Sequence, residues 1–121
     1  MKPEPYDLQI EENVYEPMLT YLRSFDEDEE PGYTEEDILR CRRLLEDYVR
    51  SLCALEKPEE DAILDRVQQT VEAINELNEQ TDFAMIETDE REAICQLIQS
   101  AALDCGLPDT AEDVTEPWRE W

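Results

Sequence analysis

The chain has 121 residues, 40% of them apolar, which is enough for one domain with a hydrophobic core and short for two. Its 34 acidic and 10 basic residues give a formal net charge of −24, which excludes nucleic acid and membranes with anionic lipids as direct partners because like charges repel. A basic protein surface is favoured as partner instead.

The N-terminal segment, residues 1–14, combines acids with two prolines and lacks the apolar stretch of a signal peptide. We therefore expect a cytoplasmic protein whose first 14 residues are extended or irregular. A short helix is predicted from about Glu16 to Phe25, with Pro17 in its first turn.

Residues 26–33 are predicted to form an acidic loop that ends in the turn signal Pro31-Gly32. Acids alternate from Asp26 to Asp37 as in a calcium-binding loop, but the sixth position, where the sharp turn needs glycine, is Pro31. Because of this mismatch, no metal site is predicted here. No P-loop or dinucleotide-binding fingerprint occurs in the chain either, so no cofactor is predicted.

The next helix is predicted from Thr34 to about Glu56, with Thr34 as N-cap and Asp37 completing a capping box. Its apolar seam recurs at spacings of three and four and comprises Ile38, Cys41, Leu45, Tyr48, Leu52 and Leu55. Three heptads at most are too few to distinguish a coiled coil from the antiparallel packing of an ordinary helix bundle, and we predict the bundle. Pro58 begins the following helix, so the short link predicts an antiparallel hairpin.

Acidic residues share one face of this second hairpin helix, residues 58–80. Within about 60° of one another at the helical period lie Asp61, Asp65, Glu72, Glu76 and Glu79, which we call the acidic stripe. No basic residue falls within the stripe. By contrast, the preceding helix pairs Glu36 with Arg40 and Glu46 with Arg50 at i, i+4 spacing. The stripe is either a solvated surface or a binding face for a basic partner, and we predict the latter.

A fourth helix is predicted from its N-cap Thr88 to Gly106, a C-terminal cap. The tail, residues 108–121, is predicted to be acidic and irregular, and it contains both tryptophans, Trp118 and Trp121. A large aromatic ring is costly to expose, so the tail either packs on its own domain or anchors a partner. Both tryptophans are included in the predicted binding site.

Catalytic and metal-binding motifs are weak in this chain. There is no histidine, and the four cysteines have no CxxC spacing, so Cys41 and Cys95 are interpreted as small buried apolar residues. Pairs of glutamates at ExxE spacing occur, yet an acidic chain produces such pairs by chance. We therefore predict no catalytic residues.

The predicted fold is all-α, a single domain over residues 1–121 built as a small bundle of about four helices with an acidic C-terminal tail. The predicted function is a non-enzymatic inhibitor, antitoxin or immunity-like protein that binds a basic partner, such as a nuclease, a toxin or a nucleic-acid-binding protein. Two alternatives remain, a structural module that acts as a helical homodimer and a divalent-metal-dependent helical hydrolase.

Overall fold

Helices are the regular elements of this structure. The computed structural model describes residues 1–110 and 112–121, and its regular elements within them are all helical. They are α1 (Glu4–Ile10), the π-helical segment η1 (Glu11–Tyr15), α2 (Glu16–Arg23), α3 (Glu35–Cys53), α4 (Glu60–Gln80) and α5 (Thr88–Cys105). Because α1, η1 and α2 follow one another without a break, they form one N-terminal rod. The prediction of a small all-α bundle is confirmed.

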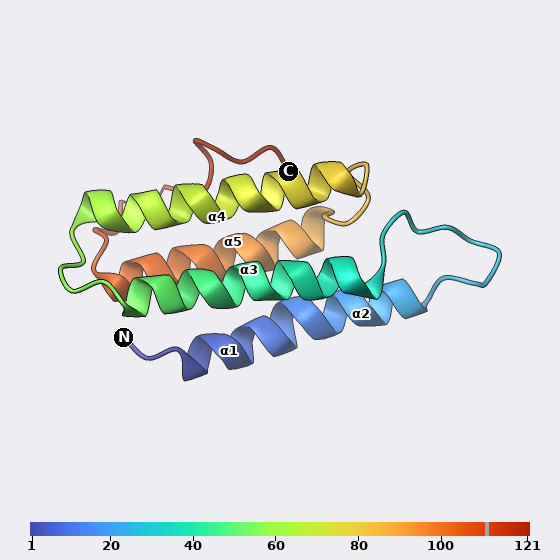
Figure 1. Ribbon diagram of the computed structural model, residues 1–121, viewed down its shortest axis with the longest axis horizontal. Coiled ribbons are helices and arrows are strands. Elements are labelled where there is room, and N and C mark those ends of the chain that lie inside the picture. Colours follow the sequence, from blue (N-terminus) through green and yellow to red (C-terminus); the bar gives the residue numbers. More distant parts are fainter. Residues whose placement is uncertain (111) are drawn as a thin grey trace.

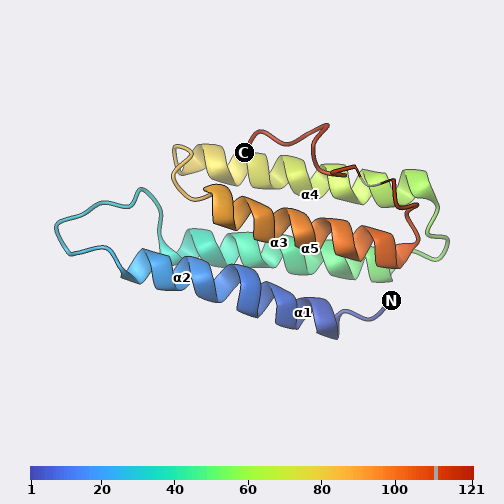
Figure 2. The ribbon, with the colours of Figure 1, turned by 180° about the vertical axis from the view of Figure 1, so that it is seen from behind.

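The four rods run alternately up and down the long axis of the bundle (Figure 1). Helices α3 and α4 form the predicted antiparallel hairpin, and α5 packs against both of them. The N-terminal rod contacts α3 and α5 on the side of the bundle away from α4 (Figures 1 and 2). Helix α4 and the N-terminal rod therefore present two separate outer surfaces.

The N-terminal rod corrects the prediction that residues 1–14 are extended or irregular. Pro3 occupies the N-cap and Pro5 the first turn of α1, where proline is tolerated because those N–H groups have no helical partner. The buried side chains Ile10, Val14 and Met18 are spaced by four, a spacing that drifts by about 40° per step in an α-helix. The wider π turn between them offsets part of this drift, because its i→i+5 bonds take more residues per turn.

Most helix ends follow local chemistry, but α3 ends at Cys53 and α4 begins at Glu60, so Pro58 lies in the link between them and not at the predicted helix start. The Thr34–Asp37 capping box is present, and Gly106 ends α5 with a φ of 124°, a conformation that favours glycine. Thr88, however, is the first residue of α5 and not its N-cap. Glu87 takes the N-cap position without a side-chain hydrogen bond. Residues 26–33 lie in the loop that joins α2 to α3.

The core lies where the inner faces of the four rods meet. Leu45, Ile63, Ile74 and Leu97 are completely buried there. The Tyr48 hydroxyl donates a hydrogen bond of 2.8 Å to the carbonyl of Ile98, so α3 is also tied to α5 by a polar contact inside the core. Among the described residues, no helix is both long and apolar enough to cross a lipid bilayer.

Candidate functional site

The acidic stripe lies on the outer face of α4. Helical periodicity directs Ile63, Val67 and Ile74 into the core, which leaves the opposite face of the helix in solvent. All five predicted carboxylates are exposed, namely Asp61, Asp65, Glu72, Glu76 and Glu79. At 1.5 Å per residue the stripe extends for about 27 Å, so one rigid element holds the five charges in a fixed row.

One carboxylate of the stripe is neutralised, although the sequence places no basic residue within it. The Arg66 guanidinium reaches sideways and forms an ion pair of 2.9 Å with Asp65, because a long arginine side chain spans the neighbouring position on the helix surface. Gln68 donates to Glu72 without changing its charge. Among the described residues, no lysine or arginine forms an ion pair with the other four carboxylates of the stripe.

The exposed surface of α3 shows the opposite arrangement. Arg42 lies 3.7 Å from Glu46 and also binds Glu11 of the N-terminal rod at 2.7 Å. Arg43 lies 3.9 Å from Glu36. Exposed pairs of this kind contribute only about 0.2–1 kcal/mol each, but they lower the local negative potential. On the acidic stripe of α4, Asp65 is the residue with an ion pair among the described residues, and Arg40 and Arg43 of α3 line a groove with Glu76 without an ion pair to it.

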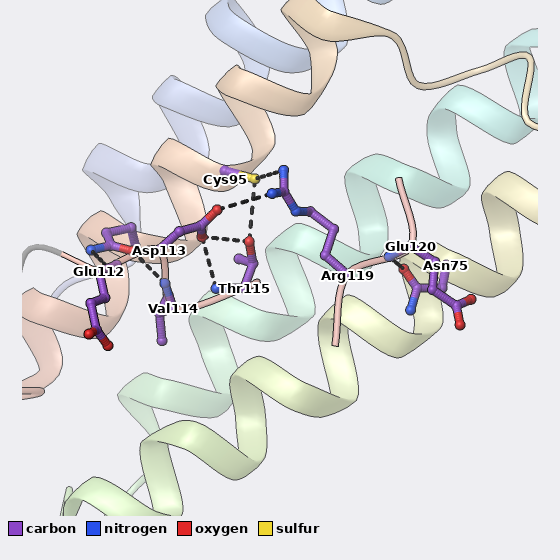
Figure 3. Close-up of polar contacts among 9 residues, drawn as sticks. Asn75, Cys95, Glu112, Asp113, Val114, Thr115, Arg119 and Glu120 are labelled. Atoms are coloured by element: carbon purple, nitrogen blue, oxygen red, sulfur yellow. Dashed lines mark hydrogen bonds and ion pairs between the residues drawn. The ribbon is translucent and has the colours of Figure 1, made fainter. Parts of the chain in front are cut away.

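The C-terminal tail is held against α4 and α5 by two amide side chains (Figure 3). The Asn75 amide nitrogen donates to the carbonyl of Trp118 at 2.7 Å, and its amide oxygen accepts from the Glu120 N–H at 3.0 Å. Gln99 of α5 likewise donates to the Glu112 carbonyl at 2.9 Å and accepts from the Val114 N–H at 3.0 Å. Each amide thus clamps the tail backbone at two points.

Polar contacts also organise the tail itself. The Asp113 carboxylate accepts from the Thr115 N–H and hydroxyl and forms an ion pair of 3.3 Å with Arg119. Arg119 also approaches the Cys95 sulfur at 3.5 Å (Figure 3). The prediction that Cys95 is a buried apolar residue is therefore corrected, because this thiol is only half-buried and has polar neighbours. Burial raises the pKa of Cys95, while Thr115 and Arg119 act against the rise.

Trp118 and Trp121 pack partly buried against the core of their own domain. The Arg119 guanidinium lies over the Trp121 ring at 5.5 Å, a cation–π contact. Of the two alternatives from the sequence, this is packing on the same domain. A role of the two tryptophans in partner binding stays a prediction.

Tail docking brings both parts of the predicted site to the same side of the molecule. The end of the tail runs beside α4 (Figure 1). Asn75, which binds it there, lies between Glu72 and Glu76 of the stripe in sequence. The exposed tail glutamates Glu116 and Glu120 therefore add negative charge beside α4. Asn75 and Gln99 are not predicted from the sequence. A neutral amide on the side of a helix has the same pattern whether it binds another segment or is only solvated.

The described residues contain no group of three or more Cys, Asp or Glu side chains that could hold a metal ion. The loop that resembles a calcium site uses its last acid elsewhere. The Asp37 carboxylate accepts from the Thr34 N–H at 2.9 Å in the capping box.

Comparison with known proteins gives no relative. No protein-family model matches the sequence, and no curated protein or solved structure matches it significantly.

Substituting Asn75 by alanine should release the end of the tail. The change removes both hydrogen bonds to the tail backbone, which should make the free energy of tail docking less favourable by about 1–3 kcal/mol. Because both tryptophans of the chain are in the tail, their fluorescence reports on docking, and we expect emission to move to longer wavelength. Gln69→Ala, which removes an α4 amide that binds Asp65, is the matched control. Equal spectra for the two variants would contradict the clamp.

Proposed function

We propose that this protein is a non-enzymatic, cytoplasmic binding module that neutralises a basic partner, as inhibitors, antitoxins and immunity-like proteins do. The observation that supports it best is the row of four exposed carboxylates on α4 that have no ion-pair partner among the described residues. The partner would be a nuclease, a toxin or another nucleic-acid-binding protein.

Stability alone does not account for this row. Glu72 and Glu76 stand at i, i+4 on the same helix, where like charges cost a few tenths of a kcal/mol. On α3 the exposed Arg43 lies 3.9 Å from Glu36, so a solvated face of this chain can hold an arginine beside an acid. The unpaired row is therefore better explained by a cationic ligand that compensates it on binding.

The spacing of the row suits a surface that otherwise binds phosphates. Successive carboxylates of the full stripe, with Asp65 included, are offset by about 4.5–10 Å along the helix axis, a scale comparable with the separation of charges on a nucleic-acid strand. Because Asp65 is paired with Arg66, the unpaired Asp61 and Glu72 are about 16.5 Å apart along the axis. A rigid helix loses little conformational entropy when it binds, and a net charge of −24 accelerates encounter with a basic protein. The docked tail adds Glu116 and Glu120 to the same field.

The proposal is tested by affinity capture from the native cytoplasm at about 0.05 M and about 0.5 M salt, with bound proteins identified by mass spectrometry. We expect one basic protein in stoichiometric amount at low salt, lost at high salt. Sedimentation of the purified chain is measured in parallel. A homodimer that strengthens with salt, with no basic protein captured, would contradict the proposal and favour the structural module.

A further inference from the structure

A groove on the other side of the bundle has no role in the contact proposed for α4. It lies between the second half of the N-terminal rod and the beginning of α5, and has a volume of about 760 Å³. Helix α2 and the beginning of α5 are at the same end of the molecule (Figure 2). The exposed Pro17 and Tyr21 form its apolar part, whereas Val14 and Met18, which also line it, are core residues only 2% and 1% exposed. This volume is in the range of pockets that hold a ligand or a few side chains.

Carboxylates line both walls of this groove. Glu12 and Glu16 project from the N-terminal rod, and Glu87, Asp89 and Glu90 from the start of α5. None of the five forms an ion pair among the described residues, and no basic residue lines the groove. The apolar part therefore lies between two unneutralised acidic rims.

The helix dipole explains only one of the two walls. Asp89 and Glu90 lie in the first turn of α5, where negative charge stabilises a helix. Glu12 and Glu16 lie inside the continuous N-terminal rod, where no free helix N-terminus is available to them. The dipole of α5 therefore does not account for Glu12 and Glu16.

The pKa of Tyr33 is affected by the carboxylates at this end of the bundle. Burial, with the charges of Glu90 and Glu87 adding to it, raises the pKa of Tyr33 to about 12. Tyr21 exposes 43% of its surface and meets Phe25 edge-on, with ring centroids 5.2 Å apart. An exposed aromatic face beside carboxylates is a favourable environment for a guanidinium group.

We propose that this groove binds a short segment of a partner protein in which an apolar residue lies between two arginines. The arginines would pair with the two acidic rims, and the apolar side chain would contact the exposed Pro17 and Tyr21. A second copy of this chain is disfavoured because each copy carries −24, and nucleic acid is repelled for the same reason. The groove and the α4 face are separate surfaces, so this inference does not depend on the function proposed for α4.

The test uses two synthetic peptides, acetyl-Arg-Leu-Arg-amide and acetyl-Arg-Gly-Arg-amide, titrated into the full chain at about 0.1 M salt and followed by NMR. We expect the leucine peptide to bind at least about fivefold more tightly, since only its side chain reaches apolar surface. Backbone shifts should concentrate at Val14, Met18, Tyr21 and Thr88. Equal affinity of the two peptides, or shifts spread over all acidic surfaces, would overturn the proposal.

Matched variants separate the groove from general attraction to an acidic protein. The pair Glu12→Gln and Glu16→Gln should weaken the leucine peptide about tenfold, whereas Glu27→Gln with Glu30→Gln changes the net charge equally at the loop and should change affinity less than twofold. Reversal of Asp65, Glu72 and Glu76 to lysine should also leave groove binding within about threefold, because those residues lie on α4. Equal weakening by the groove and loop pairs would overturn the proposed site.

Discussion

Reversal of Asp65, Glu72 and Glu76 to lysine should weaken partner binding about a thousandfold. Close charge pairs across protein interfaces couple by about 1.5 kcal/mol or more, so losing the pairs made by Glu72 and Glu76 costs about 3 kcal/mol. Asp65 already has Arg66 as its partner, and repulsion from the three new lysines adds the remainder of the about 4 kcal/mol that a thousandfold change requires. All three side chains are exposed, so the fold has little reason to change. The measurement is the dissociation constant for the captured partner, accompanied by far-ultraviolet circular dichroism of the variant.

A control with the same change of net charge decides whether position matters. Glu27, Asp28 and Glu30 are exposed in the loop between α2 and α3, and none of them forms an ion pair among the described residues. Their joint reversal to lysine should weaken binding only a few-fold, through the long-range field. Comparable losses in both triple variants would show that the partner responds to overall charge and would refute the assignment to α4.

The position of the acidic stripe follows from the sequence because it depends on one helix alone. The 3.6-residue period separates the buried Ile63 and Ile74 from the exposed Asp65 and Glu76 without knowledge of the other helices. Docking of the tail is different in kind. It depends on how Asn75 and Gln99, 24 positions apart, are placed by the packing of α4 against α5. Pattern within a single element cannot supply such a relation.

The N-terminal rod shows a second limit of pattern reading. Prolines at positions 3 and 5 are compatible with an irregular segment and also with the first turn of a helix. Tertiary contacts decide between the two, since Arg50 of α3 binds the Asp7 carboxylate with bonds of 3.0 and 3.1 Å and Arg42 binds Glu11. The helix is thus fixed by packing on α3 more than by its own propensity.

Alkaline pH should remove several kcal/mol of stability from this bundle. Burial raises the pKa of the Cys41 thiol to about 12 and, with nearby glutamates, that of Tyr33 to about 12, and burial also raises the pKa of Tyr48. Each of these groups is neutral in the folded state and ionises more readily in the unfolded chain. Their contribution is complete below the unfolded values, near 9 for cysteine and 10 for tyrosine, and is lost as pH rises through about 12.

The expected size follows from about 1.4 kcal/mol per pKa unit, which gives at most about 3 kcal/mol for Tyr33 and about 4 kcal/mol for Cys41. Guanidinium unfolding at pH 8, 10 and 11.5, followed by circular dichroism, measures this loss. Tyr33→Phe removes one of the ionising groups and should lose less stability over that interval than the unsubstituted chain. Tyr21→Phe makes the same chemical change at an exposed ring. If both variants lose stability in parallel with the unsubstituted chain, ionisation of Tyr33 is not coupled to unfolding, and repulsion among the surface carboxylates becomes the better account of alkaline instability.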